Sequence, residues 1–217
     1  MQASSDVGLD QPEAAPNPFP DDQDLRFVNI SFLSTHEDTA DRCELDSHAD
    51  TCVAGSNTAV LFYTGEKVSV SPFIGEYQPL PDIPIATVAT AWDNPVNGDT
   101  ILLIVNEALY FGDHLKHSLL CPNQLRHFGL QVNDVPKEFG SGSSHSIIIP
   151  DHGLEIPLEL SGVISYIPTR LPTQEELSQC LQVEITSPSP WLPYSSQVAQ
   201  VYTEHLHPTS CANPIEL

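Results

Sequence analysis

Basic residues are scarce in this 217-residue chain, and their scarcity narrows the range of its partners. Only seven lysines and arginines stand against 29 acidic residues, which gives a formal charge of −22. A surface of this charge repels phosphate backbones, so we expect no direct binding to nucleic acid. The same charge opposes the association of two copies of the chain, most strongly at low salt.

The sequence also lacks the long apolar runs that mark membrane-spanning and secreted proteins. Its longest apolar runs are well short of the roughly 18 residues that a membrane span needs, so no membrane partner is expected. The N-terminal stretch is acidic and has no apolar centre, unlike a signal peptide. The five cysteines are odd in number and irregularly spaced, as expected of reduced thiols. We therefore predict a cytoplasmic or nuclear protein.

Helix-forming stretches are few, because twenty prolines interrupt the chain. The clearest local signal is a turn-rich stretch at residues 93–99, which lies between two apolar, β-branched runs and predicts a hairpin. A second hairpin is expected over residues 146–160. One short helix is predicted at residues 123–128, where Gly129 ends it. The fold class is therefore predicted to be all-β with one short helix.

Composition divides the chain into three regions. Residues 1–25 contain six acidic residues, four prolines and no basic residue, and are predicted to be disordered. Residues 26–168 hold the predicted strands, with an extra hairpin over residues 143–168. Prolines return after that, so residues 169–217 are predicted to form a proline-rich tail.

The chemistry is concentrated in one motif, where a short apolar strand is predicted to end in an aspartate. The motif is Leu45-Asp46-Ser47-His48-Ala49-Asp50-Thr51. Peptide hydrolysis by carboxylates needs two of them sharing one proton, so that one activates water and the other donates to the scissile carbonyl. The motif occurs once in the sequence. A complete site of this kind therefore requires a second copy of the chain.

A second segment, residues 109–126, decides the family. It has the sequence Leu-Tyr-Phe-Gly-Asp-His-Leu-Lys-His-Ser-Leu-Leu-Cys-Pro-Asn-Gln-Leu-Arg. Together with the Asp46 motif, and in this order, it resembles the copia-type retrotransposon proteases, which are retropepsin-like aspartic proteases. The resemblance covers residues 26–135. It implies an acid-protease barrel, closed or partly closed, of six or seven strands that forms one subunit of a homodimer with disordered tails.

The resemblance also implies a function and a role for four residues. The function is aspartic-type endopeptidase activity on a polypeptide, a Gag-Pol-like polyprotein. Asp46 matches the catalytic aspartate, and Ser47 matches the hydroxyl residue that braces the two active-site loops against each other. Ala49 and Asp50 match residues that contact substrate. Residues 65–85 match the substrate-covering flap, and no metal or cofactor is implied.

Two positions depart from the family pattern. His48 stands where the family has glycine, which lets the backbone approach the substrate and the partner loop closely. The imidazole either blocks that approach or turns outward to solvent. Cys121-Pro122 stands where retropepsins have Gly-Arg. These departures support an alternative hypothesis, a catalytically inactive, decayed or repurposed protease fold that acts as a binding or dimerisation module.

Other side chains near the motif allow two further interpretations. Cys43, His48 and Cys52 are zinc-ligand types, but structural zinc needs four ligands and no paired spacing follows. A cysteine nucleophile with His48 as its base lacks an orienting third group. Buried thiols beside a surface histidine are the favoured interpretation. Trp92 is predicted to lie in the core and Trp191 to anchor the tail.

Overall fold

The computed structural model describes residues 40–70, 78–140 and 142–194, all within the compact unit Thr39–Leu217. The structural statements below concern these residues. The segment 1–25 predicted to be disordered lies outside them, as does the start of the predicted domain at residues 26–39.

Strands dominate the described part of the chain, which confirms that the fold is mostly β. The strands are β1 (Arg42–Leu45), β2 (Val53–Gly55), β3 (Ala59–Val70), β4 (Leu80–Asp93), β5 (Thr100–Gly112), β6 (Ser118–Leu120), β7 (Gln131–Asn133), β8 (Ser146–Ile149), β9 (Leu154–Pro157), β10 (Glu159–Ser161), β11 (Ile164–Pro168) and β12 (Leu181–Glu184). The helices are α1 (Pro122–His127), α2 (Gln174–Gln179) and the 3₁₀ turn η1 (Pro150–His152). Neither α-helix of the described part has the length and apolar character needed to cross a lipid bilayer.

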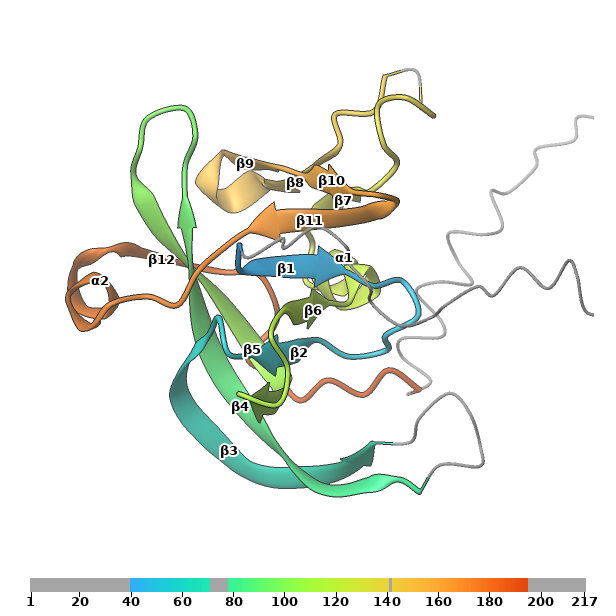
Figure 1. Ribbon diagram of the computed structural model, residues 1–217, viewed down its shortest axis with the longest axis vertical. Helices are drawn as coiled ribbons and strands as arrows, with labels where there is room; N and C mark the ends of the chain where they lie inside the picture. The colour runs from blue at the N-terminus through green and yellow to red at the C-terminus, as the bar shows by residue number, and fades with distance from the viewer. Residues whose placement is uncertain (1–39, 71–77, 141, 195–217) are drawn as a thin grey trace, which may run out of the picture. The chain divides into compact units, whose positions relative to one another are not determined.

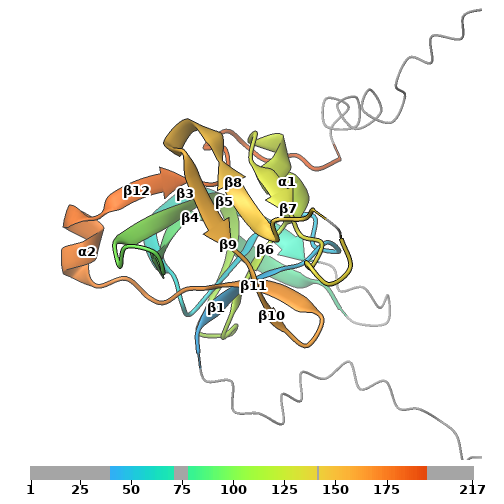
Figure 2. The ribbon, with the colours of Figure 1, turned by 90° about the horizontal axis from the view of Figure 1, so that it is seen from above.

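The strands form two separate sheets (Figures 1 and 2). The larger sheet has nine strands, in the order β10-β11-β1-β6-β2-β5-β4-β3, with β12 paired to β5 outside this path. The smaller sheet consists of β7, β8 and β9. Among the described residues no barrel closes, so the closed form of the expected barrel is corrected, and the expected six or seven strands are replaced by a nine-stranded and a three-stranded sheet. The physical reason is that β11 pairs with the outer edge of β1, which extends the sheet beyond the family match.

The predicted local elements form at or near the expected positions. β4 and β5 make the predicted hairpin, in which Asp93 pairs with Thr100 across the turn. The predicted helix is α1, with Pro122 in its first turn. Cys121 caps its start, and the left-handed backbone of Gly129 (φ +99°) follows its end. The second predicted hairpin is β8–β9, although it joins the smaller sheet and does not extend the larger one.

Residues 169–194, which belong to the predicted proline-rich tail, contain a helix and a strand. Within that range α2 forms with a complete capping box, in which Thr173 and Glu176 exchange hydrogen bonds. β12 then pairs in parallel with β5, and Val183 and Ile185 enter the main core. The apolar residues of this segment are too few and too scattered to produce a periodic signal. β12 therefore forms because its backbone pairs with the open edge of β5. Trp92 lies in the core as predicted, 1% exposed.

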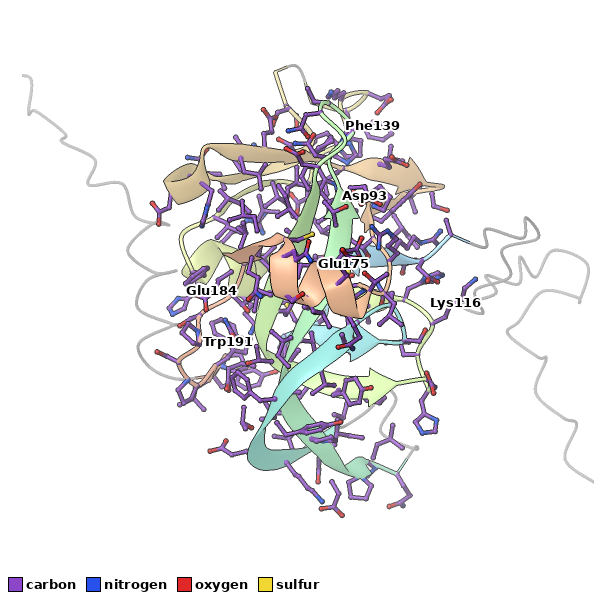
Figure 3. The ribbon with its side chains drawn as sticks, turned by 90° about the vertical axis from the view of Figure 1, so that its left-hand side faces the viewer. Asp93, Lys116, Phe139, Glu175, Glu184 and Trp191 are labelled. Atoms are coloured by element: carbon purple, nitrogen blue, oxygen red, sulfur yellow. The ribbon has the colours of Figure 1, made fainter. Side chains whose placement is uncertain are left out.

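Arg170 links α2 to the end of β4 through hydrogen bonds and ion pairs. Its guanidinium donates to both carboxylate oxygens of Asp93 at 2.9 Å, and to Glu176 at 2.6 and 2.9 Å (Asp93 is labelled in Figure 3). The hydrogen bonds from Arg170 lower the pKa of Glu176 to about 2, and they lower the pKa of Asp93 as well. Carboxylates with lowered pKa values stabilise the fold above their ordinary pKa range, and this stabilisation is lost as pH falls through the lowered values.

Arg170→Gln is therefore expected to lower the free energy of unfolding by about 1 kcal/mol at pH 7, the range of partly exposed ion pairs. The difference from the wild type should shrink as pH falls from about 5 toward 2, because both carboxylates become protonated. Urea unfolding at several pH values measures this. Arg126→Gln is the control, since Arg126 makes one ion pair, to Asp134 at 3.1 Å. A pH-independent loss in Arg170→Gln contradicts the prediction.

Candidate active site

Asp46 lies where β1 leaves the larger sheet. β1 runs between β11, which is antiparallel to it, and β6, which is parallel (Figure 1). The last pair along β6 is Leu45 with Leu120, and the amide of Asp46 donates to the carbonyl oxygen of Leu120 at 3.0 Å. The strand pairing thus continues one residue past β1 and fixes the backbone of Asp46 itself.

A tight turn holds the Asp46 carboxylate. The amide of His48 donates to Oδ1 of Asp46 at 2.9 Å, and the amide of Ala49 donates to the Asp46 carbonyl oxygen at 3.3 Å. The Asp46 side chain is 38% exposed. The carboxylate is therefore oriented by the backbone of its own loop while one side of it remains open to solvent.

The His48 imidazole points away from the protein. Its side chain is 92% exposed, and its Nδ1 lies 3.9 Å from Oδ1 of Asp46. Of the two orientations considered from the sequence, the single chain adopts the outward one. Only the backbone of His48 contributes to holding the carboxylate, and that contribution does not depend on the side chain at this position.

The second sequence segment, residues 109–126, holds the far end of the same loop. The Cys52 amide donates to Oε1 of Gln124 at 2.8 Å, and Sγ of Cys52 accepts from the Cys121 amide at 3.2 Å. The Leu109 amide donates to the Cys52 carbonyl oxygen at 2.9 Å. Residues 109–126, which are distant in sequence from the Asp46 loop, therefore hold both its entry, through Leu120, and its exit, through Cys121 and Gln124.

Asn57 supports β1 from inside the protein. It is fully buried, and its Nδ2 donates to the carbonyl oxygen of Arg42 and to Oγ1 of Thr169, each at 3.0 Å. Its Oδ1 accepts from Oγ of Ser118 at 2.6 Å. Sequence reasoning identified neither Asn57 nor Gln124 as a support of the site. Gln124 lies inside the segment that carries the family resemblance, whereas no feature of the sequence singles out Asn57.

The other predicted site residues lie in the same loop but differ in exposure. Ser47 is exposed at the turn, Ala49 is half-buried and Asp50 is exposed. Asp50 is the most engaged of the three, since Oδ2 accepts from the Tyr194 hydroxyl at 2.8 Å. Its backbone carbonyl oxygen accepts from Nε1 of Trp191 at 2.7 Å. Residues from the predicted tail thus reach the loop, which the sequence did not indicate beyond an anchoring role for Trp191.

A groove of about 550 Å³ lies beside Asp50. It is bounded by the loop (Asp50, Thr51), by the hairpin strands β3 and β4, by β5 and by residues 191–194. The described parts of the predicted flap, residues 65–70 and 78–85, belong to this hairpin. Asp46 is not among the lining residues. The groove therefore extends along the side of the loop that carries Asp50, four residues after Asp46.

The cysteine-based interpretations lose support from the geometry. Cys43 and Cys52 are buried, and burial raises the pKa of both thiols, which disfavours the reactive thiolate. His48 is exposed, so these three side chains do not share a site. Within the described ranges, no group of three or more His, Cys, Asp or Glu side chains is placed to hold a metal ion. The favoured interpretation, buried thiols beside a surface histidine, is confirmed.

Neither a protein-family model, nor a curated protein, nor a solved structure matches this chain. The motif resemblance and the geometry of the Asp46 loop are therefore the observations from which a function is inferred.

Proposed function

We propose that this chain is one subunit of a retropepsin-like aspartic endopeptidase of retrotransposon origin, whose catalytic pair forms when the Asp46 loops of two copies meet. One observation carries the proposal: both ends of the Asp46 loop are hydrogen-bonded to residues 109–126. These are the two segments on which the family resemblance rests, and proximity in space is what a shared active-site framework requires.

The proposed reaction uses two Asp46 carboxylates with one proton between them. The ionised carboxylate removes a proton from a water molecule, which attacks the scissile carbonyl, and the protonated one donates to the carbonyl oxygen. The His48 amide holds Oδ1 of each Asp46 and limits the rotation of the carboxylate. Ser47 is exposed at the turn, which supports its proposed role of bracing the partner loop.

An extended polypeptide, such as a Gag-Pol-like polyprotein, is the substrate class that the surroundings support. The β3–β4 hairpin borders the groove beside the loop, in the sequence position of the family's flap. In the sequence of the loop, Ala49 and Asp50 follow Asp46, and Asp50 lines the groove. A chain lying along the groove would therefore pass Asp50 before it reached the carboxylate pair.

Digestion of a peptide library between pH 4 and 7, with and without a statine-type transition-state mimic, tests the proposal. A protease of this kind cleaves best toward the acidic end, where one proton is retained by the pair, and the mimic blocks cleavage because its hydroxyl binds between the carboxylates. High salt should raise the activity at low protein concentration, because it screens the charge of −22 that separates two copies. Cleavage that the mimic leaves unchanged would refute the proposal.

One observation favours the second candidate, a non-catalytic binding or dimerisation module. The 92% exposed imidazole of His48 lies on the loop through which two copies would meet, where the family has glycine. A binding module should form dimers in sedimentation experiments and cleave no peptide at any pH in the range tested. A dimer that cleaves peptides excludes this alternative.

A further inference from the structure

A segment from the predicted tail lies on Asp50 and Glu107 and forms one wall of the groove beside the Asp46 loop. We call residues 191–194 (Trp-Leu-Pro-Tyr) the strap. Trp191 donates from Nε1 to the carbonyl oxygen of Asp50 at 2.7 Å, and Tyr194 donates from its hydroxyl to Oδ2 of Asp50 at 2.8 Å. The Trp191 amide donates to Oε2 of Glu107 at 3.3 Å. Figure 3 labels Trp191 on the chain that continues from Glu184.

The contacts of the strap all have the same polarity. Asp50 contributes a carboxylate and a carbonyl oxygen, and Glu107 contributes a carboxylate, so the groove presents acceptors and the strap supplies the donors. The Trp191 ring also lies 5.2 Å from the His127 ring of α1. The groove is thus matched to a peptide that carries Trp and Tyr side chains with N–H and O–H groups.

The strap is tethered close to the groove by Thr186. Thr186 is fully buried, accepts from the Asn106 amide at 2.7 Å and donates to the Asn106 carbonyl oxygen at 2.9 Å. Only Ser-Pro-Ser-Pro, residues 187–190, separates this anchor from Trp191. A short tether holds a ligand at an effective concentration on the order of millimolar or above. The proline rings further reduce the freedom that is lost when the strap binds.

The strap itself is held loosely. Tyr194 is 87% exposed and Leu192 is 62% exposed, whereas Trp191 and Pro193 are half-buried, so hydrogen bonds and a limited burial together attach the strap. Thr186, in contrast, has no exposed surface. Residues 187–194 can therefore leave the groove while the anchor at Asn106 and the pairing of β12 with β5 stay intact.

We propose that the strap is a built-in peptide ligand of Asp50 and Glu107, and that a peptide rich in Trp and Tyr binds these two residues only when the strap has left. Its consequence for catalysis, competition between the strap and the substrate, rests on the function proposed above. The binding of the strap to Asp50 and Glu107 does not rest on that function, because it follows from the hydrogen bonds between them.

The test is the binding of a fluorescent peptide, residues 187–194, to the full-length chain. All proteins carry Asp46→Asn, so that the peptide is not consumed. Trp191→Ala with Tyr194→Phe removes two strap hydrogen bonds, each worth a factor of about two to ten. We expect this double variant to bind the peptide at least about tenfold more tightly than the protein with the native strap. In the double variant the strap leaves Asp50 and Glu107 for more of the time, so the peptide can bind them. Adding Asp50→Ala should abolish that gain.

Tyr166→Phe is the matched control, since the Tyr166 hydroxyl also donates to a carboxylate at 2.8 Å, that of Glu159, away from the groove. It should leave peptide binding unchanged. Equal peptide affinity with and without the native strap, or no binding to the double variant, overturns the proposal. If the wild-type chain cleaves no peptide while the Asp46→Asn proteins show the tenfold difference, the proposed function alone is refuted. If the wild-type chain cleaves peptides and the difference is absent, the strap proposal alone is refuted.

Discussion

Asp46→Asn is expected to reduce peptide cleavage by about a thousandfold or more while leaving the fold and the proposed dimer intact. An amide can neither take a proton from water nor share one with the partner carboxylate, and proton transfer by positioned groups contributes factors of about 10² to 10⁴. The oxygen of the substituted side-chain amide can still accept from the His48 amide, which in the native chain donates to Oδ1 of Asp46 at 2.9 Å. The turn should therefore survive the substitution, and the loss should appear in kcat.

Asp151→Asn is the control for Asp46→Asn. Asp151 is an exposed aspartate in the turn η1. None of the contacts of the Asp46 loop described above involves a residue of η1. It should change cleavage less than about twofold, as expected of a surface substitution. Sedimentation of both variants checks that the dimer persists. Residual cleavage by Asp46→Asn at the wild-type rate would exclude Asp46 as the catalytic residue.

Asn57→Ala is expected to lower the free energy of unfolding by about 3 kcal/mol. The substitution removes the partner of three buried groups: the carbonyl oxygen of Arg42 and the hydroxyls of Thr169 and Ser118. A buried polar group left without its partner costs about 1–3 kcal/mol. The Thr169 hydroxyl keeps a contact with Cys43 Sγ at 3.3 Å, which moderates the total. Urea unfolding at pH 7 measures the effect.

The position of Asn57 gives this substitution a second, local consequence. Asn57 binds the carbonyl oxygen of Arg42 at the start of β1, the strand whose last residue, Leu45, precedes Asp46. It also binds β6 through Ser118. Hydrogen exchange at β1 amides should therefore accelerate more than exchange at β8 or β9, which belong to the other sheet. Asn123→Ala, at an exposed position of α1, serves as the control and should cost less than about 0.5 kcal/mol. Equal losses in the two variants would contradict this role for Asn57.

The local elements were predictable because their signals are short-range. The turn formers at residues 93–99 and the flanking β-branched runs specify the β4–β5 hairpin through adjacent residues alone. The same holds for α1, where Pro122 and Gly129 mark the two ends. The position of the Asp46 motif at the end of a short strand was also predictable, since the apolar residues before it end there.

Elements that depend on distant partners were not predictable. β12 is stabilised by pairing with the open edge of β5. The sequence Leu181–Glu184 does not indicate that its partner strand lies some eighty residues earlier in the chain. The buried amides of Asn57 and Gln124 look like ordinary polar residues in sequence, because their role is defined by which backbone groups the fold places beside them. The open sheet was likewise decided by β11 pairing with β1.

By itself, then, the sequence determined the mostly β character, the hairpins, the short helix and the loop chemistry of residues 46–51, because local propensity and side-chain type suffice for each. Only the tertiary structure decided that residues 109–126 hold that loop, that His48 faces solvent and that the strap lies on Asp50. These outcomes depend on contacts between residues far apart in the chain, whose energies exist only once the sheet has brought them together.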